Sequence, residues 1–304
     1  MEHLIFKIIS RFTGLTILFM IVLNGCTPTP KVIPQNQALA QKLESLTRDF
    51  RGDIGIYVKH LESGQEITIN ADQLFPTASM IKVPILMTLF DRIDGGDLDY
   101  DSTFMWVPEV VNYPAGGILS SFRDSSKISL KKMISLMITY SDNHASLWCQ
   151  DLAGGGVAIN DWLAENGYDQ TRMNSRTPNR KDDWEVYGWG QTTPREMANL
   201  ITLIHENKAV SPTASEEMYR YLTRIFWDDE ALSQIPRTVQ VASKQGAVND
   251  SRSEVVLVNA PAGDYVFCII TNHQEDQSWG QDNEGFALIR EVSNILWHNY
   301  GMGR

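Results

Sequence analysis

The chain has 304 residues, a formal net charge of −11 at pH 7 and 43% hydrophobic residues. This acidic balance, without any basic run, argues against a nucleic-acid-binding protein. The length and apolar content suffice for one large core, and six histidines without ligand-like spacing predict neither a metal nor another cofactor.

The N-terminal segment has the pattern of a secretory signal. Lys7 and Arg11 precede the apolar run Leu15–Leu23. As a helix this run would rise only about 14 Å, whereas a membrane-spanning helix must cross about 30 Å of hydrocarbon. We therefore predict an exported protein whose signal peptide, residues 1–25, is removed.

The signal ends at Cys26, which follows Leu23-Asn24-Gly25. Small residues before a cysteine resemble the lipobox of bacterial lipoproteins, in which the cysteine is lipidated and becomes the mature N-terminus. This resemblance implies a lipid anchor at Cys26 and a tether over residues 26–36. The protein would then be attached to the cell envelope, facing the periplasm or on the outer membrane of a Gram-negative cell. The alternative is an ordinary cleaved signal with an incidental cysteine.

Hydrophobic periodicity predicts strands near both ends of the exported chain and helices between them. The predicted strands are Asp53–Leu61, Glu66–Asn70, Thr238–Lys244, Glu254–Asn259 and Tyr265–Asn272. The predicted helices are Ala38–Phe50, Ser79–Arg92, Leu130–Tyr140, Asn143–Leu152, Ala158–Asn166, Pro194–Glu206, Ser215–Ile225 and Gly285–Tyr300. Together they predict an α/β (α+β) sandwich over residues 37–304. An antiparallel five-stranded sheet flanked by helices would carry an inserted all-helical lobe.

Two cysteines remain in the exported part, Cys149 and Cys268. An oxidising compartment would allow them to form a disulfide, but distant positions in the sequence do not show that they meet. Two buried free thiols are therefore the expected state.

The quartet Ser79-Met80-Ile81-Lys82 places a hydroxyl nucleophile one helical turn from an amine. Residues three apart share a helix face, so the two side chains can meet in one pocket. A desolvated lysine can take the proton of a serine hydroxyl and make it nucleophilic. Taken alone, so short a pattern favours an exposed serine and lysine on an ordinary helix, because matches of this length recur by accident.

Two further motifs contain residue types suited to the same chemistry. In Ser141-Asp142-Asn143 a second hydroxyl can relay a proton and an amide can hold a substrate carbonyl, although these residues also cap helices. In Lys244-Gln245-Gly246 a lysine can attract a substrate carboxylate, and Gly246 allows a ligand to approach the backbone. A lysine that protects an edge strand is the alternative there.

In this order and spacing the three motifs resemble the signatures S-x-x-K, S-D-N and K-T-G of penicillin-recognising serine enzymes, specifically class A β-lactamases. Val83-Pro84 and Thr192-Thr193-Pro194 also look like that family, and the resemblance covers residues 38–300. It implies a helical lobe beside an α/β sandwich, which matches the predicted order of elements.

The resemblance also implies a role for each motif residue. Ser79 would attack a carbonyl to give an acyl-enzyme, Lys82 would be the base or part of its relay, and Ser141 would protonate the leaving nitrogen. The backbone N–H groups of Ser79 and Ala247 would form an oxyanion hole. The substrate ligands would be Asn143, Lys244, Gln245 and Gly246. Gln245 replaces the Thr or Ser of the family, which leaves hydroxyl recognition of the carboxylate unsupported.

A larger departure lies between Asp169 and Pro194, a segment called the 169–194 loop below. Class A β-lactamases carry a glutamate there, in E-x-x-L-N, that activates the deacylating water. Threading without a gap places Thr177-Pro178-Asn179-Arg180 at this motif. Glu185 follows within an aromatic stretch whose burial could raise its pKa, but a structural ion pair is the favoured interpretation.

Three classes of function are compatible with these motifs. The first, which we favour, is a monomeric serine hydrolase of class A type that acts on a β-lactam or a related amide. The second is a D,D-peptidase-like, penicillin-binding cell-wall enzyme, which needs no such glutamate. The third is a slow-deacylating or non-catalytic protein that binds a β-lactam or peptidoglycan.

Overall fold

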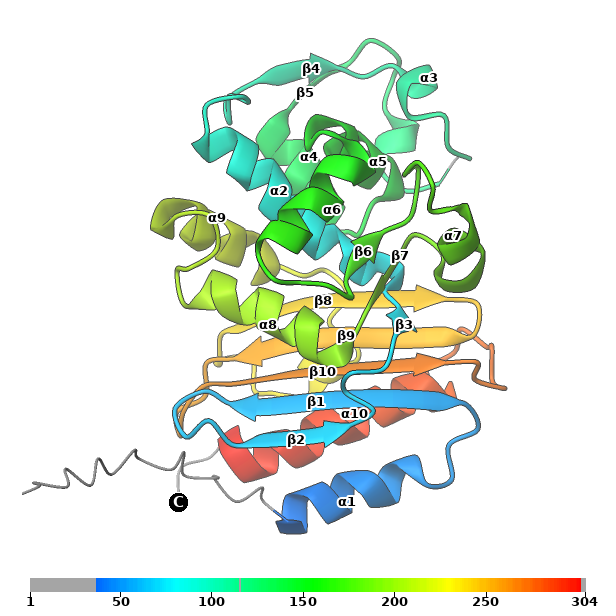
Figure 1. Cartoon of the computed structure of the whole chain (residues 1–304), viewed down its shortest axis with the longest axis vertical. Helices are drawn as coiled ribbons and strands as arrows, with labels where there is room; N and C mark the ends of the chain where they lie inside the picture. Colours follow the sequence, from blue (N-terminus) through cyan, green and yellow to red (C-terminus); the bar gives the residue numbers. More distant parts are fainter. Residues whose placement is uncertain (1–36, 115, 302–304) are drawn as a thin grey trace, which may run out of the picture. The chain divides into compact units, whose positions relative to one another are not determined.

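The computed structural model describes residues 37–114 and 116–301. The predicted signal peptide, the tether and Cys26 lie outside these residues. A five-stranded sheet forms the base of the described part, with helices on both of its faces (Figure 1). The fold class predicted from the sequence is confirmed.

The five strands run in the order β2-β1-β10-β9-β8, and every neighbouring pair is antiparallel. The strands are β1 (Asp53–His60), β2 (Glu66–Ile69), β8 (Val241–Val248), β9 (Ser251–Val258) and β10 (Tyr265–Asn272). Because β1 pairs with β10, the two ends of the described chain meet in the middle of the sheet. Strand β8 is left as an edge, and this edge faces the helical lobe (Figure 1).

Alternate residues of the central strands enter two different cores. In β9, Val255 and Leu257 join the core shared with the helical lobe, whereas Val256 and Val258 join the core on the other face. Successive side chains of a strand point to opposite faces, so a strand covered on both sides becomes apolar throughout. This burial explains the almost continuous hydrophobic run in that part of the sequence.

Helices provide the rest of both cores. The helices are α1 (Gln37–Thr47), α2 (Lys82–Asp94), α3 (Pro108–Val111), α4 (Leu130–Thr139), α5 (Asn143–Leu152), α6 (Gly155–Glu165), α7 (Lys181–Tyr187), α8 (Pro194–His205), α9 (Pro212–Leu222) and α10 (Glu284–Leu296). Helices α1 and α10 supply one core, and α2, α4, α5, α6, α8 and α9 supply the other (Figure 1). Every residue from Lys82 to Phe90 in α2 is buried, so this helix is the centre of the lobe.

Two small sheets connect the lobe to the main sheet and to its own loops. One contains β3 (Phe75–Pro76), β7 (Gly190–Thr192) and β6 (Arg172–Met173), and the other contains β4 (Thr103–Met105) and β5 (Lys127–Ser129). Periodicity did not predict these strands, because two or three residues are too short to show an alternating pattern.

Several predicted boundaries were wrong in ways that matter for the motifs. The strand predicted to end at Lys244 continues to Val248, so the Lys244 motif lies inside β8. The helix predicted from Ser79 begins as a 3₁₀ turn, Ala78–Ile81, and becomes α-helical only at Lys82.

Both free cysteines, Cys149 and Cys268, are buried, which confirms the expectation of unpaired thiols.

Leu43 in α1 offers a test of the core beneath the sheet. Its side chain is fully buried, whereas Leu46 on the same helix is only partly buried. We expect Leu43→Ala to lower the free energy of unfolding by about 2–5 kcal/mol, because it removes buried methyl groups and leaves a cavity. Leu46→Ala should cost clearly less. Denaturant unfolding of both variants measures the difference, and equal losses would contradict the described position of α1.

Candidate active site

Three parts of the fold meet at the lobe-facing edge of the sheet. The 3₁₀ turn Ala78–Ile81 packs against β8 and leads into α2, which brings Ser79 and Lys82. The junction between α4 and α5 brings Ser141 and Asn143 to the same place. Strand β8 contributes Lys244. All three motifs predicted from the sequence therefore converge.

The Lys82 amine lies at the centre of this cluster. Its Nζ is 2.9 Å from Ser79 Oγ and 3.0 Å from Ser141 Oγ. It also contacts the Ser141 carbonyl oxygen at 2.7 Å and Asn143 Oδ1 at 2.9 Å. The side chain of Lys82 is fully buried, while both serines remain partly exposed. A buried amine thus bridges two accessible hydroxyls.

Burial lowers the pKa of the Lys82 amine to about 7, and the Asp142 carboxylate nearby offsets part of that shift. The hydrogen-bond partners are compatible with a neutral amine. The Ser141 carbonyl and Asn143 Oδ1 can only accept hydrogen bonds, so an uncharged Lys82 donates to both and keeps its lone pair for the Ser79 hydroxyl proton. This arrangement makes Lys82 a suitable general base.

The Ser141 motif serves structure and chemistry at once. Asp142 caps α5 by accepting a hydrogen bond from Ala145 N at 2.9 Å, and its second oxygen accepts from Leu119 N at 2.9 Å. The capping interpretation therefore holds for Asp142, while Ser141 and Asn143 face Lys82. Ser141 adopts a left-handed φ of 59°, a conformation that is costly outside glycine and common at functional sites.

A second buried amine lies on the other side of Ser141. Lys244 Nζ is 3.1 Å from Ser141 Oγ and donates to Gln245 Oε1 at 3.0 Å. Burial lowers the pKa of Lys244 well below its usual value, and the neighbouring Lys82 adds to this effect. Two amines on one hydroxyl form a path for a proton through Ser141. Gln245 supplies an amide where the family resemblance implied a hydroxyl.

A cavity of about 600 Å³ opens beside Ser79. Its lining includes Ser79, Asn143 and Ala247, so the proposed oxyanion-hole residue on β8 faces the same space as the nucleophile. Gly246 also serves the packing of the protein itself. A Cβ there would lie 2.8 Å from the Thr77 carbonyl oxygen, so this glycine permits close approach of the backbone of the 3₁₀ turn.

Comparison with known proteins identifies the family. A profile described as the Beta-lactamase enzyme family matches residues 38–300. The chain belongs to this family. Beta-lactamase VEB-1 of Pseudomonas aeruginosa is 22% identical over 308 positions, covering 97% of this chain and 99% of that protein.

Solved structures share the fold of this chain. PBP-A is 26% identical with a TM-score of 0.77, covering 88% of this chain and 97% of its own. A class A β-lactamase from Mycobacterium abscessus is 19% identical with a TM-score of 0.76, covering 87% of this chain and all (100%) of its own. The protein is thus a serine enzyme of the β-lactamase family, with the fold of a class A β-lactamase.

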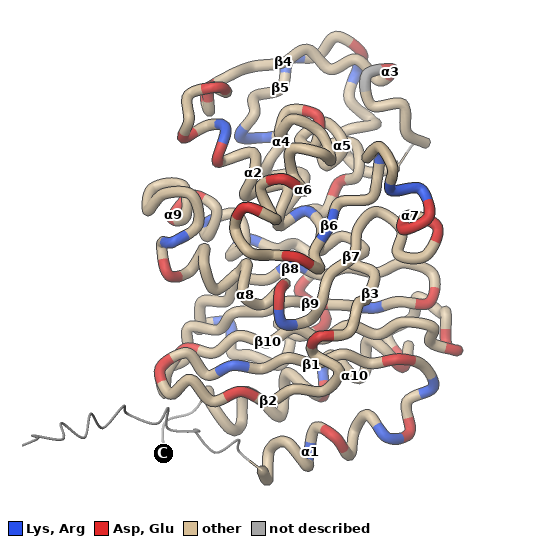
Figure 2. The backbone as a smooth tube through the Cα atoms, viewed as in Figure 1, with Lys and Arg blue, Asp and Glu red and all other residues tan. Residues whose placement is uncertain are grey.

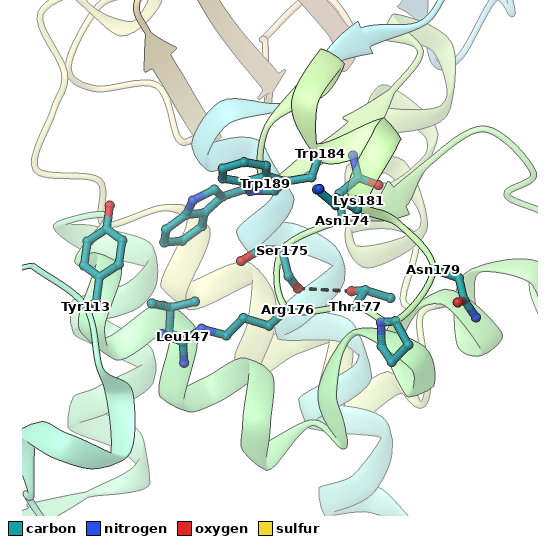
Figure 3. Close-up of a pocket in the computed structure, with 11 residues that line it drawn as sticks. Tyr113, Leu147, Asn174, Ser175, Arg176, Thr177, Asn179, Lys181, Trp184 and Trp189 are labelled. Atoms are coloured by element: carbon teal, nitrogen blue, oxygen red, sulfur yellow. Dashed lines mark hydrogen bonds between the residues drawn. The ribbon is translucent and has the colours of Figure 1, made fainter.

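In this β-lactamase family member, the 169–194 loop contains no carboxylate at the position threaded onto the class A glutamate. Thr177 is found there, and its hydroxyl donates to the Ser175 carbonyl at 3.0 Å (Figure 3). Gly156 makes room for it, since a Cβ at that glycine would lie 1.8 Å from Thr177 Oγ1. A cavity of about 540 Å³ adjoins Thr177, and none of the described residues that line it is Asp or Glu.

Glu185, the predicted alternative base, is exposed. It lies on α7, where no described side chain is buried and where basic residues directly precede acidic ones (Figure 2). Its carboxylate is 3.8 Å from Lys181 Nζ, and 59% of its side chain is accessible. The alternative of a buried carboxylate is therefore wrong, and the ion-pair interpretation is confirmed. Glu185 still lines the Ser79 cavity.

The aromatic residues around the cavities were mostly missed by sequence reasoning. Tyr113 and Trp189 line both the Ser79 cavity and the Thr177 cavity, with ring centroids 5.5 Å apart (Figure 3). Tyr113 lies in an irregular segment after α3, where no periodicity marks a wall residue. Trp189 belongs to the aromatic stretch around Glu185. The sequence could not show that its ring centroid lies 6.0 Å from Lys82 Nζ.

Gly246→Ala tests the contact between β8 and the 3₁₀ turn. The new methyl group would push the strand away from Thr77, so we expect acylation of Ser79 by a fluorescent penicillin to slow about ten- to hundredfold. Gly280→Ala is the control, because a Cβ at Gly280 meets nothing within 4 Å. Equal labelling of both variants, with folding checked by circular dichroism, would contradict this role of Gly246.

Proposed function

We propose that the protein is an envelope-anchored serine hydrolase that opens the amide of a β-lactam, or of a related compound, through an acyl-enzyme on Ser79. The observation that carries the proposal is the contact of a buried, neutralisable Lys82 amine with Ser79 Oγ at 2.9 Å. Membership of the β-lactamase enzyme family supports the substrate class.

Acylation needs a proton to leave one serine and another to reach the leaving nitrogen. Ser79 Oγ forms a bond to the lactam carbonyl carbon and passes its proton to Lys82 Nζ. As the C–N bond breaks, the nitrogen takes the proton of Ser141 Oγ. Lys82 is 3.0 Å from Ser141 Oγ and returns a proton to it, which leaves the lysine neutral again.

Other residues would bind the substrate and stabilise the negative charge on its oxygen. The N–H groups of Ser79 and Ala247 would hold the developing oxyanion, where a single lost donor costs about 2.7–4 kcal/mol. Asn143 would hold the acyl side of the substrate. Lys244 and the amide of Gln245 would hold its carboxylate, because an anion beside Lys244 favours the protonated amine and opposes the effect of burial.

Release of the acyl group is the step with the least support. No described residue lining the Thr177 cavity is acidic, and Glu185 is exposed and paired with Lys181. This observation favours a second candidate, a D,D-peptidase-like penicillin-binding enzyme or a slow-deacylating binding protein. A mutant of PBP-A, which is 26% identical to this chain, has been solved as an acyl-enzyme complex with penicillin G.

We also propose that Cys26 is lipidated and anchors the domain to the envelope through the tether. The support is the sequence pattern around Cys26 alone. Within residues 37–114 and 116–301, no helix is long and apolar enough to cross a membrane. In this proposal the domain acts as a monomer on a small β-lactam or peptidoglycan-like substrate.

Intact-mass spectrometry with penicillin G tests the acyl-enzyme directly. We expect wild type to gain the mass of one penicillin and Ser79→Ala to gain none. A wild-type protein that stays unmodified and also leaves the penicillin unhydrolysed would refute acylation. The lifetime of the adduct then separates the candidates, because rapid release indicates a β-lactamase and persistence for hours indicates a penicillin-binding protein.

The Glu185→Gln variant tests whether Glu185 takes part in deacylation. We expect it to release the acyl group at the wild-type rate, and slower release would assign this residue to deacylation.

The pH dependence of acylation tests Lys82 as the base. The neutral amine is the active form and its pKa is about 7, so the acylation rate should rise about tenfold from pH 6 to pH 8. Lys82→Arg keeps a cation that does not deprotonate, so acylation should fall by about 10²–10⁴-fold and lose this rise. A rise centred above pH 9 in wild type would contradict the assignment.

A further inference from the structure

A second cavity, of about 440 Å³, lies on the Ser141 side of the active site. Its lining includes Ser141 and Asn143 but not Ser79, whereas the Ser79 cavity includes Asn143 but not Ser141. The two serines therefore face different spaces, which share Asn143 and Tyr113 as a common wall.

An aromatic cluster of Tyr140, Phe226 and Trp227 forms one side of this region. The rings of Tyr140 and Phe226 stack at 4.9 Å, and Phe226 and Trp227 meet edge to face at 5.1 Å. Of the three, Tyr140 and Trp227 line the cavity itself. The three side chains are 39% (Tyr140), 54% (Phe226) and 50% (Trp227) accessible, so the cluster is one exposed aromatic patch.

Hydrogen bonds fix the cluster at the end of α4. Trp227 Nε1 donates to the Tyr140 carbonyl at 3.0 Å, and Phe226 N donates to the Thr139 carbonyl at 3.1 Å. Tyr140 directly precedes Ser141, so the rings are ordered next to the proposed proton donor. An aromatic surface that is already ordered binds a ring with a small loss of conformational entropy.

The charge of the cavity selects the kind of group that fits. Among the described lining residues, Asp142 is the one charged side chain, and both of its oxygens accept backbone hydrogen bonds. The remaining described lining side chains are uncharged, and several are aromatic or aliphatic. Such a wall favours a flat, uncharged ring that stacks on an aromatic face.

The positions of Ser79 and Ser141 decide which half of the substrate reaches this cavity. Ser79 bonds to the acyl carbon, and Ser141 protonates the leaving nitrogen on the opposite side. We propose that the cavity bounded by Tyr140 and Trp227 is a binding site for an aromatic ring on the leaving-group side of the scissile amide. This inference rests on the proposed function and adds a preference for cephalosporin-type substrates whose C3 substituent carries a ring.

Two cephalosporins with the same thienylacetyl acyl group test the site. Nitrocefin carries a dinitrostyryl ring system at C3, and cephalothin carries a small acetoxymethyl group there. We measure acyl-enzyme formation with both and take the ratio of the two rates, so that intrinsic reactivity cancels between variants. Trp227→Ala should lower the nitrocefin-to-cephalothin ratio roughly three- to tenfold, and Trp227→Phe should retain most of it.

Trp279→Ala is the matched control, because Trp279 is 65% accessible and is not among the residues lining the described cavities. Its ratio should equal that of wild type. An unchanged ratio in Trp227→Ala, or the same loss in Trp279→Ala, would overturn the proposal. If both rates fall equally in Trp227→Ala, the ratio stays unchanged, and the loss reflects a general disturbance of Ser141 instead of a lost ring site.

Calorimetric binding to Ser79→Ala separates this inference from the proposed function. If neither probe acylates wild type, the acyl-enzyme mechanism fails. The ring site still stands if Ser79→Ala binds nitrocefin more tightly than cephalothin and the added Trp227→Ala change removes the difference. Equal affinity of Ser79→Ala for the two probes would overturn the ring site, whether or not wild type is acylated.

Discussion

The burial of one amine between two serine hydroxyls is the constraint on which the active site depends. Lys82 is charged at little cost in water, but inside the protein its pKa falls to about 7 because the surrounding atoms replace solvent poorly. Burial disfavours the protonated form of Lys82, and the neutral amine that remains can act as the base. Everything that keeps water from Lys82 therefore contributes to the reactivity of Ser79.

The fold supplies this environment from three directions. Helix α2 is buried along most of its length, so the residue at its start is withdrawn from solvent. The α4–α5 junction offers two oxygens that can only accept, and β8 closes the remaining side. Gly246 lets β8 approach the Thr77 carbonyl, and a side chain there would separate the strand from the nucleophile. A rigid sheet with two cores holds these parts in register.

Much of this arrangement was predictable from the sequence, and the limits have physical causes. Five strands and the main helices were found because their apolar periodicity is long enough to read. The strand end at Val248 was missed because residues 245–248 are partly exposed or small and do not alternate clearly. The Ser79, Ser141 and Lys244 motifs identified the reacting groups, yet spacing could not show that Ser141 lies between two amines. The favoured ion pair of Glu185 is present, whereas the alternative of a buried carboxylate is wrong, because the aromatic neighbours of Glu185 in the sequence lie on the exposed helix α7.

The central claim is that Lys82 is neutral when Ser79 reacts. The most direct test is an NMR titration of the lysine side chains, with Lys82→Arg used to assign the Lys82 signal. We expect a Lys82 midpoint near pH 7. A midpoint above pH 9 would show that the amine stays charged at neutral pH and would contradict its role as the base.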